Sequence, residues 1–172
     1  MKPYYLCHSA DIIECMANSD NVIRAGLTPK LRDIPNLLAG LTYTSGLPSQ
    51  HVVQPVPFRP PTIHHAPAEP QFTPVVVRTL LYDPPAPEFS VLYAVVPPGS
   101  TETHRALGGP SVAIALAGCG IVRWAEAGTL NVSVGHVIFL GQGIEVRFEA
   151  EATVEDGKQD LVLCRAFVEA DD

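Results

Sequence analysis

Residues 112–117 of this 172-residue chain read VAIALA, and their large side chains (Val112, Ile114, Leu116) alternate with three alanines. A period of two places alternate side chains on opposite faces of a β-strand, so the stretch predicts a strand. Large residues set against small ones are typical of a tightly packed β-sandwich. Comparable alternation occurs in four further stretches, residues 89–96, 129–134, 144–148 and 161–163.

Glycines separate these predicted strands, at Gly99, Gly118, Gly128 and Gly135 among others. Glycine allows a tight turn because it has no Cβ to restrict the backbone. Short strands at this spacing predict an antiparallel sandwich or a small barrel. The expected fold class is therefore mainly β, and we expect residues 88–172 to form a cupin-like jelly roll.

Residues 31–41 are the exception, because they carry an apolar stripe at helical spacing that includes Ile34, Leu37 and Leu38. Asp33 is placed to cap this helix, and Pro35 fits its first turn, where no backbone N–H is needed. The stripe predicts one short helix that packs through its apolar side.

A proline-rich segment, residues 46–87, follows the helix. It contains eight prolines before residue 75 (Pro48, Pro55, Pro57, Pro60, Pro61, Pro67, Pro70 and Pro74). Proline at this density excludes helix and central strand, although residues 51–53 and 56–58 can form an edge strand. We interpret the segment as a connection between residues 1–45 and the barrel of residues 88–172. His64 and His65 within it are interpreted as loop residues, because adjacent side chains on extended backbone point apart.

The composition of the chain limits the classes of function that it can have. The chain is 47% hydrophobic and 17% charged with a formal net charge of −7, which favours a globular fold and argues against nucleic-acid binding. No apolar run is long enough to span a membrane, and no signal-peptide core is found. The four cysteines (Cys7, Cys15, Cys119 and Cys164) have no CxxC spacing, so we expect free thiols in the cytoplasm.

Residues 12–30, IIECMANSDNVIRAGLTPK, hold charges in an unusual setting. Residues 12–16 and 22–23 have the apolar character of strands, and residues 18–21 form a predicted polar turn. Glu14, Asp20, Arg24 and Lys30 thus lie among apolar residues, which is an odd place for ordinary solvated charge. From spacing alone, an ion pair that joins Arg24 to Glu14 or Asp20 and fixes the turn is the simpler interpretation.

The order of these residues resembles the signature of type I mannose-6-phosphate isomerases. The similar segments are residues 14–17 (ECMA), 19–21 (SDN), 24–30 (RAGLTPK), 41–43 (LTY), 82–85 (YDPP), 88–89 (EF) and 165–168 (RAFV). The resemblance covers nearly the whole chain from Asp11 onward. It implies the C-terminal portion of such an isomerase, with residues 1–45 as an incomplete remnant of the catalytic cupin barrel.

The resemblance also implies a reaction, the interconversion of mannose 6-phosphate and fructose 6-phosphate with the help of zinc. Arg24 matches the family's catalytic arginine, which stabilises enediolate-like charge. Glu14, Asp20 and Lys30 match residues that line the substrate site. Physical chemistry agrees in outline, because a guanidinium is always charged and can bind adjacent oxygens in a forked geometry.

The family's zinc ligands are not found in this sequence. Tyr5 stands where the family has a histidine ligand, His8 lies three residues away, and the other ligands come from segments upstream of this region. We therefore expect no metal site, no bound cofactor and no isomerase activity for this chain alone, although the phosphorylated sugar remains the expected ligand. Open strand edges are also expected to allow self-association.

Two rival interpretations remain open. One is a non-catalytic cupin module that binds sugar phosphates or associates with other proteins. The other is a metal-dependent cupin enzyme that uses Glu102 and His104, which share one face of a predicted strand at i and i+2. Two ligands do not complete a zinc site, so the predicted barrel of residues 88–172 is interpreted as structural.

Overall fold

The computed structural model describes residues 12–18, 23–24, 28–58, 78–125, 128–152 and 159–169. The chain divides into two compact units, Met1–Val52 and Val53–Asp172. The first unit contains helix α1 (Ile34–Ala39) and the 3₁₀ helix η1 (Pro48–His51). No helix in the described residues is long and apolar enough to cross a membrane.

Helix α1 forms where the sequence predicts it, but it is shorter than residues 31–41. Oδ1 of Asp33 accepts a hydrogen bond from the backbone N–H of Asn36 at 3.2 Å, and the helix ends at Gly40. This arrangement confirms the predicted N-cap, which satisfies one of the free N–H groups of the first turn. The prediction that the stripe packs is wrong, because Ile34 is 53% and Leu38 52% exposed.

The strand predicted over residues 12–16 is also wrong. Residues 12–18 have no regular secondary structure, and Ile12 and Met16 are 63% and 75% exposed. A strand is held by hydrogen bonds to a neighbouring strand, and apolar sequence alone does not replace them. The second predicted strand covered residues 22–23. Ile23 has no regular secondary structure, and Val22 lies outside the described residues.

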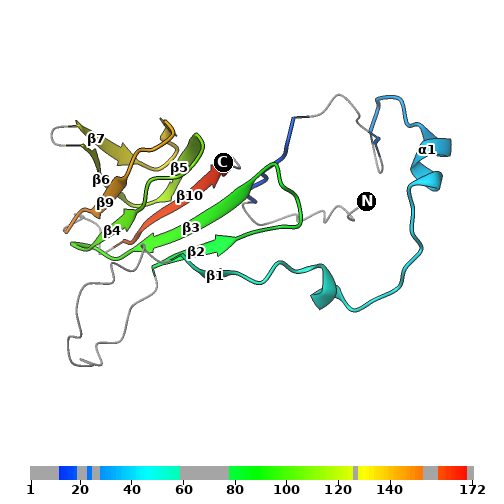
Figure 1. Ribbon diagram of the computed structural model, residues 1–172, viewed down its shortest axis with the longest axis horizontal. Coiled ribbons are helices and arrows are strands. Elements are labelled where there is room, and N and C mark those ends of the chain that lie inside the picture. The colour runs from blue at the N-terminus through cyan, green and yellow to red at the C-terminus, as the bar shows by residue number, and fades with distance from the viewer. Residues whose placement is uncertain are drawn as a thin grey trace. The chain divides into compact units, whose positions relative to one another are not determined.

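The second unit consists of two antiparallel sheets (Figure 1). The six-stranded sheet has the order β1-β2-β3-β10-β5-β8, and its strands are β1 (Val56–Pro57), β2 (Thr79–Tyr82), β3 (Ser90–Val96), β10 (Leu161–Phe167), β5 (Ser111–Ala117) and β8 (Val137–Leu140). The four-stranded sheet has the order β4-β9-β6-β7, and its strands are β4 (Thr101–His104), β9 (Val146–Ala150), β6 (Cys119–Trp124) and β7 (Gly128–Ser133). The mainly β, cupin-like sandwich expected from the sequence is confirmed.

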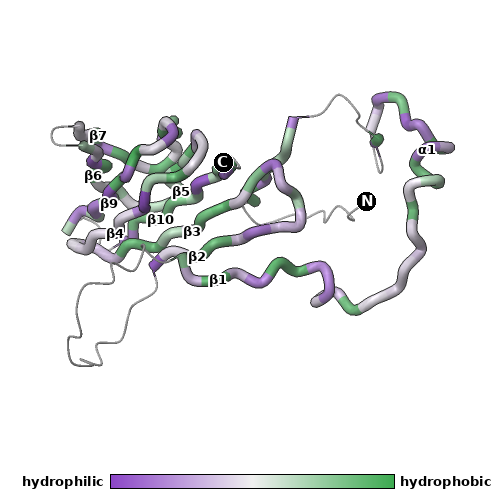
Figure 2. The backbone as a smooth tube through the Cα atoms, in the orientation of Figure 1, coloured by the Kyte–Doolittle hydropathy of each residue, from purple (hydrophilic) through white to green (hydrophobic). Residues whose placement is uncertain are grey.

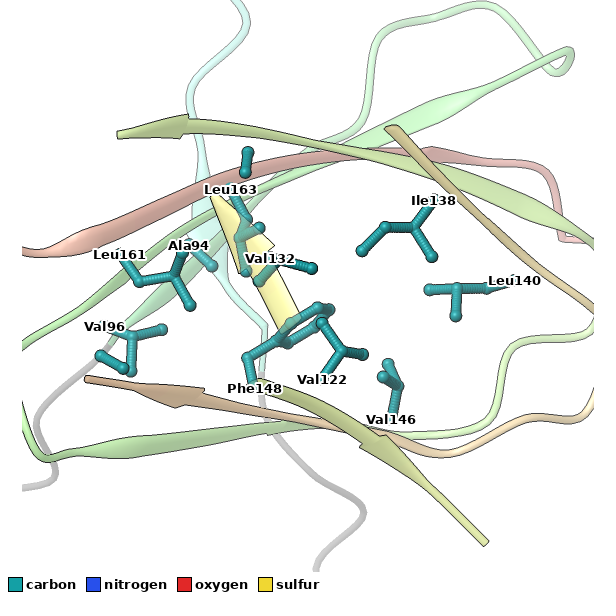
Figure 3. Packing of buried hydrophobic residues seen from close by; sticks show 12 residues of the cluster. Ala94, Val96, Val122, Val132, Ile138, Leu140, Val146, Phe148, Leu161 and Leu163 are labelled. Atoms are coloured by element: carbon teal, nitrogen blue, oxygen red, sulfur yellow. The ribbon is translucent and has the colours of Figure 1, made fainter. Parts of the chain in front are cut away.

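The core lies between the two sheets, and Figure 3 shows its side chains converging from both layers. Phe148 and Val122 of the four-stranded sheet meet Leu163 of the six-stranded sheet, and all three are at most 1% exposed. The alanines of β5 that alternate with larger residues, Ala113 and Ala115, face this core. A second, smaller cluster joins Leu92, Leu107 and Phe167, with Phe58 and Leu81 packed against it.

The two sheets differ sharply on their outward sides. The cross-strand registers place side chains without formal charge on the outward side of the six-stranded sheet, here called the apolar outer face: Leu80, Tyr82, Val91, Tyr93, Val95, Val112, Ile114, Ala117, Val137, Phe139, Val162, Cys164 and Ala166. The outward side of the four-stranded sheet carries Arg123, Arg147 and Glu149 together with threonine, asparagine and serine. The hydropathy colours along the strands can be followed in Figure 2.

Strand β1 forms one margin of the six-stranded sheet, as expected for the proline-rich segment. It pairs with β2 through Val56 and Pro57, and the N–H of Phe58 donates to the carbonyl oxygen of Thr79 at 3.0 Å. Pro57 is tolerated because an edge strand needs hydrogen bonds on only one side. This pairing also places Phe58 beside the barrel interior.

Candidate functional site

The residues predicted to line a substrate site lie in the first unit. Glu14 and Lys30 are exposed, Arg24 is half-buried, and Asp20 lies outside the described residues. Within the described part of the chain, no hydrogen bond or ion pair joins Arg24 to Glu14 or Lys30. The backbone N–H of Lys30 donates to Oγ1 of Thr28 at 3.2 Å, which closes a local turn. The grouping of these four residues into a site therefore stays a prediction.

The barrel interior holds a polar cluster that the sequence analysis only partly anticipated. Glu102 and His104 of β4 lie on one strand face and both contact Oγ1 of Thr79 on β2. The distances are 2.6 Å to Oε1 of Glu102 and 3.0 Å to Nε2 of His104. The sequence predicted that Glu102 and His104 share a strand face. It did not predict the part played by Thr79, because the strand of Thr79 was not predicted.

Arg165 of β10 completes the cluster from the opposite sheet. Its Nε donates to Oγ of Ser111 at 2.9 Å, and its Nη1 lies 3.4 Å from Nδ1 of His104. The side chain is 1% exposed. Burial and the positive charge of nearby Arg105 lower the pKa of Arg165 to about 10, so the guanidinium stays charged at neutral pH.

The contacts of His104 define its protonation. The imidazole is fully buried, and burial together with the charge of Arg165 lowers its pKa to about 3, so the ring is neutral at neutral pH. A guanidinium only donates, so Nδ1 accepts from Arg165 and Nε2 carries the proton. Nε2–H then donates to Thr79, whose hydroxyl donates to Glu102. The result is a directed hydrogen-bond chain, Arg165 to His104 to Thr79 to Glu102.

Aromatic rings enclose the imidazole. Phe58 and Phe148 stand edge-on to His104 with ring centroids at 5.5 Å and 5.0 Å. The guanidinium of Arg105 lies 5.3 Å from the centre of the Phe58 ring and forms an ion pair with Glu169 at 2.8 Å. These rings exclude water from the interior, which strengthens the hydrogen bonds of the chain.

The described residues do not fit a zinc site. No group of three or more histidine, cysteine, aspartate or glutamate side chains is arranged to hold a metal ion in the parts of the chain that the structure describes. Both ring nitrogens of His104 already have partners, and one of them is a cation. A second cation at this position would be repelled by Arg165, so the rival interpretation of a metal-dependent enzyme based on Glu102 and His104 has no physical support.

Two open hollows lie elsewhere on the second unit. One, of about 450 Å³, is lined by Phe58, Phe89, Phe167, Arg105 and Asp83 among others. The other, of about 440 Å³, lies over β6, β7 and β9 and includes Cys119, whose thiol donates to Oε2 of Glu151 at 3.0 Å. That hydrogen bond is the main reason that the pKa of Cys119 is raised, so this thiol is a poor nucleophile.

The fold defines this unit as a cupin-like β-sandwich, and its interior contains a buried arginine, Arg165. Comparisons with known proteins then place the chain. No protein-family model matches it. It is 42% identical to the mannose-6-phosphate isomerase of Cryptococcus neoformans over 160 residues, which is 93% of this chain and 32% of that protein. It is 36% identical to the Schizosaccharomyces pombe enzyme of the same name over 161 residues, which is 94% of this chain and 35% of that protein.

The fold agrees with these sequence relatives. The apo form of mannose 6-phosphate isomerase from Salmonella typhimurium superimposes with a TM-score of 0.61 at 21% identity, covering 90% of this chain and 32% of that one. The chain is similar to the mannose-6-phosphate isomerases, as its sequence motifs indicated, and the match fits a C-terminal portion of them. It spans about a third of the length of the curated relatives it matches.

Proposed function

We propose that this chain acts as the C-terminal portion of a cytoplasmic, zinc-dependent mannose-6-phosphate isomerase. The observation that carries the proposal is the 42% identity to the mannose-6-phosphate isomerase of Cryptococcus neoformans over 93% of the chain. The ligand is then a phosphorylated sugar, mannose 6-phosphate. The barrel of the second unit serves as a rigid structural module, since its interior is filled by the Arg165 chain and by apolar side chains.

The first unit contributes the side chains that meet the sugar. Arg24 provides a permanent positive charge for the negative charge that develops on the sugar oxygens during proton transfer between adjacent carbons. Glu14, Asp20 and Lys30 bind and orient the sugar phosphate. Zinc, when bound, polarises the sugar oxygens, and its ligands come from outside the described residues of this chain.

The chain alone is not catalytically competent under this proposal. We expect the purified 172-residue chain to bind no stoichiometric zinc and to show no isomerase turnover. Activity is expected when it is combined with a mannose-6-phosphate isomerase from which the matched third has been deleted. Metal content and a coupled assay of fructose 6-phosphate formation test this directly. Zinc and turnover in the isolated chain, or no activity in the combination, would contradict it.

A second candidate function is a non-catalytic module that binds sugar phosphates or associates with proteins, including copies of itself. The observation that favours it is that the second unit has a core of its own, independent of the first. Calorimetric titration with mannose 6-phosphate, with and without zinc, separates the two. Binding that is independent of zinc supports the module, whereas binding only by the zinc-loaded combination supports the isomerase.

A further inference from the structure

One of the two hollows on the second unit lies at an end of the barrel, and it is here called the barrel mouth. Its volume is about 450 Å³. Its lining includes Asp83, which directly follows β2, Ser90, which begins β3, and Phe167, which ends β10. Ser90 and Phe167 are cross-strand partners, so both lie at the same end of the six-stranded sheet. Mouths of β-barrels are common places for small-molecule sites, and this volume suits such a site.

One part of the barrel mouth is apolar. Phe58, Leu81 and Phe167 line it and also belong to the smaller core cluster, and Phe89 adds a further aromatic ring. The face of an aromatic ring carries partial negative charge and therefore attracts the C–H groups of a ligand. The apolar part thus fits a molecule that has one face made of C–H groups.

The other part of the barrel mouth is polar and keeps open hydrogen-bonding positions. Oγ of Ser90 donates to Oδ1 of Asp83 at 2.7 Å, and Nη2 of Arg105 donates to Oε1 of Glu169 at 2.8 Å. Among the described residues, neither Oδ2 of Asp83 nor Oε2 of Glu169 accepts a hydrogen bond. A hydroxyl group both donates and accepts, so a ligand with several hydroxyls matches carboxylate oxygens and a guanidinium at once.

The charges around the barrel mouth favour a ligand without net charge. Asp83 and Glu169 both line it, so an anionic ligand would meet two carboxylates and only one guanidinium, that of Arg105. Arg165 is buried deeper, where it binds Ser111, and it does not line the hollow. A cationic ligand would find the Phe58 ring already in contact with a cation, because the Arg105 guanidinium lies 5.3 Å from the ring centre.

We propose that the barrel mouth binds an uncharged pyranose sugar. The C–H face of the sugar ring packs against Phe89, and its hydroxyls bond to Asp83 and to the Arg105–Glu169 pair. A pyranose fits because it combines an apolar face with hydroxyls at its edge and has no charge. The inference goes beyond the proposed function, since the ligand carries no phosphate and every lining residue belongs to the second unit.

The experiment is an amide NMR titration of the 172-residue chain with methyl α-D-mannopyranoside and, separately, with methyl α-D-glucopyranoside. We expect at least one of these uncharged sugars to shift the amide signals of Ser90, Arg105 and Phe167 in a saturable way. Mannose 6-phosphate should bind the barrel mouth at least about five-fold more weakly, because its phosphate faces the two carboxylates. The amides of β7, on the other sheet, should not shift.

Two variants test the contacts of the sugar. Asp83→Asn removes the charge of an exposed carboxylate, and Phe89→Leu keeps an apolar side chain but removes the ring. We expect each to weaken binding at least about five-fold. Asp160→Asn is the matched control, because it removes the same charge beside Leu161, at the opposite end of β10 from Phe167, and should bind like the wild type. An unchanged pattern of amide signals shows that each variant folds, and the exposed position of Asp83 keeps the test valid if Phe89→Leu does not.

Four outcomes would overturn the inference. The first is no saturable shift at the barrel mouth with either sugar up to about 0.1 M. The second is wild-type affinity in Asp83→Asn. The third is equal or tighter binding of mannose 6-phosphate or of tetramethylammonium at the barrel mouth, which would identify an anion or a cation site. The fourth is shifts confined to the first unit, which would leave the proposed function intact.

Discussion

Arg165 and His104 connect the two sheets of the barrel, with Nη1 of the arginine 3.4 Å from Nδ1 of the imidazole. The arginine belongs to β10 of one sheet and the histidine to β4 of the other. Because a buried cation fixes which ring nitrogen is protonated, the contact also sets the direction of the hydrogen bonds through Thr79 to Glu102. Among the described residues, Nη2 of Arg165 has no hydrogen-bond partner.

The neutral state of His104 makes stability depend on pH. The pKa of His104 falls from an ordinary value of 6.5 to about 3 on folding, so the unfolded chain binds one more proton between these values. Stability from this group is therefore fully present above pH 6.5 and is lost as the pH falls towards 3. The slope from one such group is about 1.4 kcal/mol per pH unit.

The test is urea unfolding of the wild type and of His104→Gln between pH 4 and 6. We expect the wild-type free energy of unfolding to fall more steeply by about 1.4 kcal/mol per pH unit. His51→Gln, which removes an exposed histidine far from the hydrogen-bond chain in sequence, serves as the control. Equal slopes for the wild type and His104→Gln would show that the imidazole is not held neutral.

The hydroxyl of Thr79 links His104 to Glu102 in the hydrogen-bond chain, so we expect this hydroxyl to be needed for stability. Thr79→Val keeps the shape of the side chain but leaves Nε2–H of His104 without an acceptor. We expect a loss of about 1–3 kcal/mol in the free energy of unfolding, the usual cost of a buried polar group without a partner. Thr129→Val on the exposed side of β7 should change stability by less than about 0.5 kcal/mol. Equal effects of the two substitutions would argue against the directed chain.

Gly118 connects β5 to β6 in a conformation that only glycine adopts easily. Its φ is +71°, and an added Cβ would collide with the backbone carbonyl oxygen of Asp160. Gly135 has a φ of +84° but open space around it. Gly118→Ala should therefore destabilise the barrel by about 1–3 kcal/mol more than Gly135→Ala, because overpacking adds to the shared backbone strain. Thermal unfolding of both variants measures this difference, and similar losses would refute it.

Arg24 should be essential in the reconstituted isomerase. Arg24→Ala is expected to lower kcat about 100-fold or more, as the loss of a group that stabilises developing charge does. Arg32→Ala removes an exposed arginine of the same unit and should leave kcat within about two-fold. The coupled assay, run on complexes of equal composition, compares the two. Equal kcat values would remove Arg24 from the proposed site.

The sequence predicted the barrel well because its signal is local. Alternation over residues 89–96 and 112–117 reports directly which side chains face the core, and β3 and β5 formed there. Strand β6 was missed because glycine and arginine, Gly120 and Arg123, interrupt its apolar pattern. The same alternation could have revealed Arg165, since it occupies an inward position between Leu163 and Phe167.

The first unit was harder to predict because its structure depends on neighbours. Residues 12–16 have the composition of a strand, yet a strand exists only where another strand accepts its hydrogen bonds. The stripe on α1 likewise has the spacing of a packing face, but exposure depends on what covers it. The substrate-site residues share this dependence, because the grouping of Arg24 with Glu14 is a long-range property that spacing does not determine.

The two edge strands of the six-stranded sheet, β1 and β8, differ in their ability to pair with a further strand, because β1 contains Pro57. At β1 the imide nitrogen has no hydrogen to donate, so a further strand cannot be held there, whereas β8 carries only Val, Ile, Phe and Leu. Strand addition in a crowded or heated solution can therefore proceed from one side only. Two copies joined at β8 would present proline at both outer margins of the combined sheet, so this sheet would not extend further by the same route.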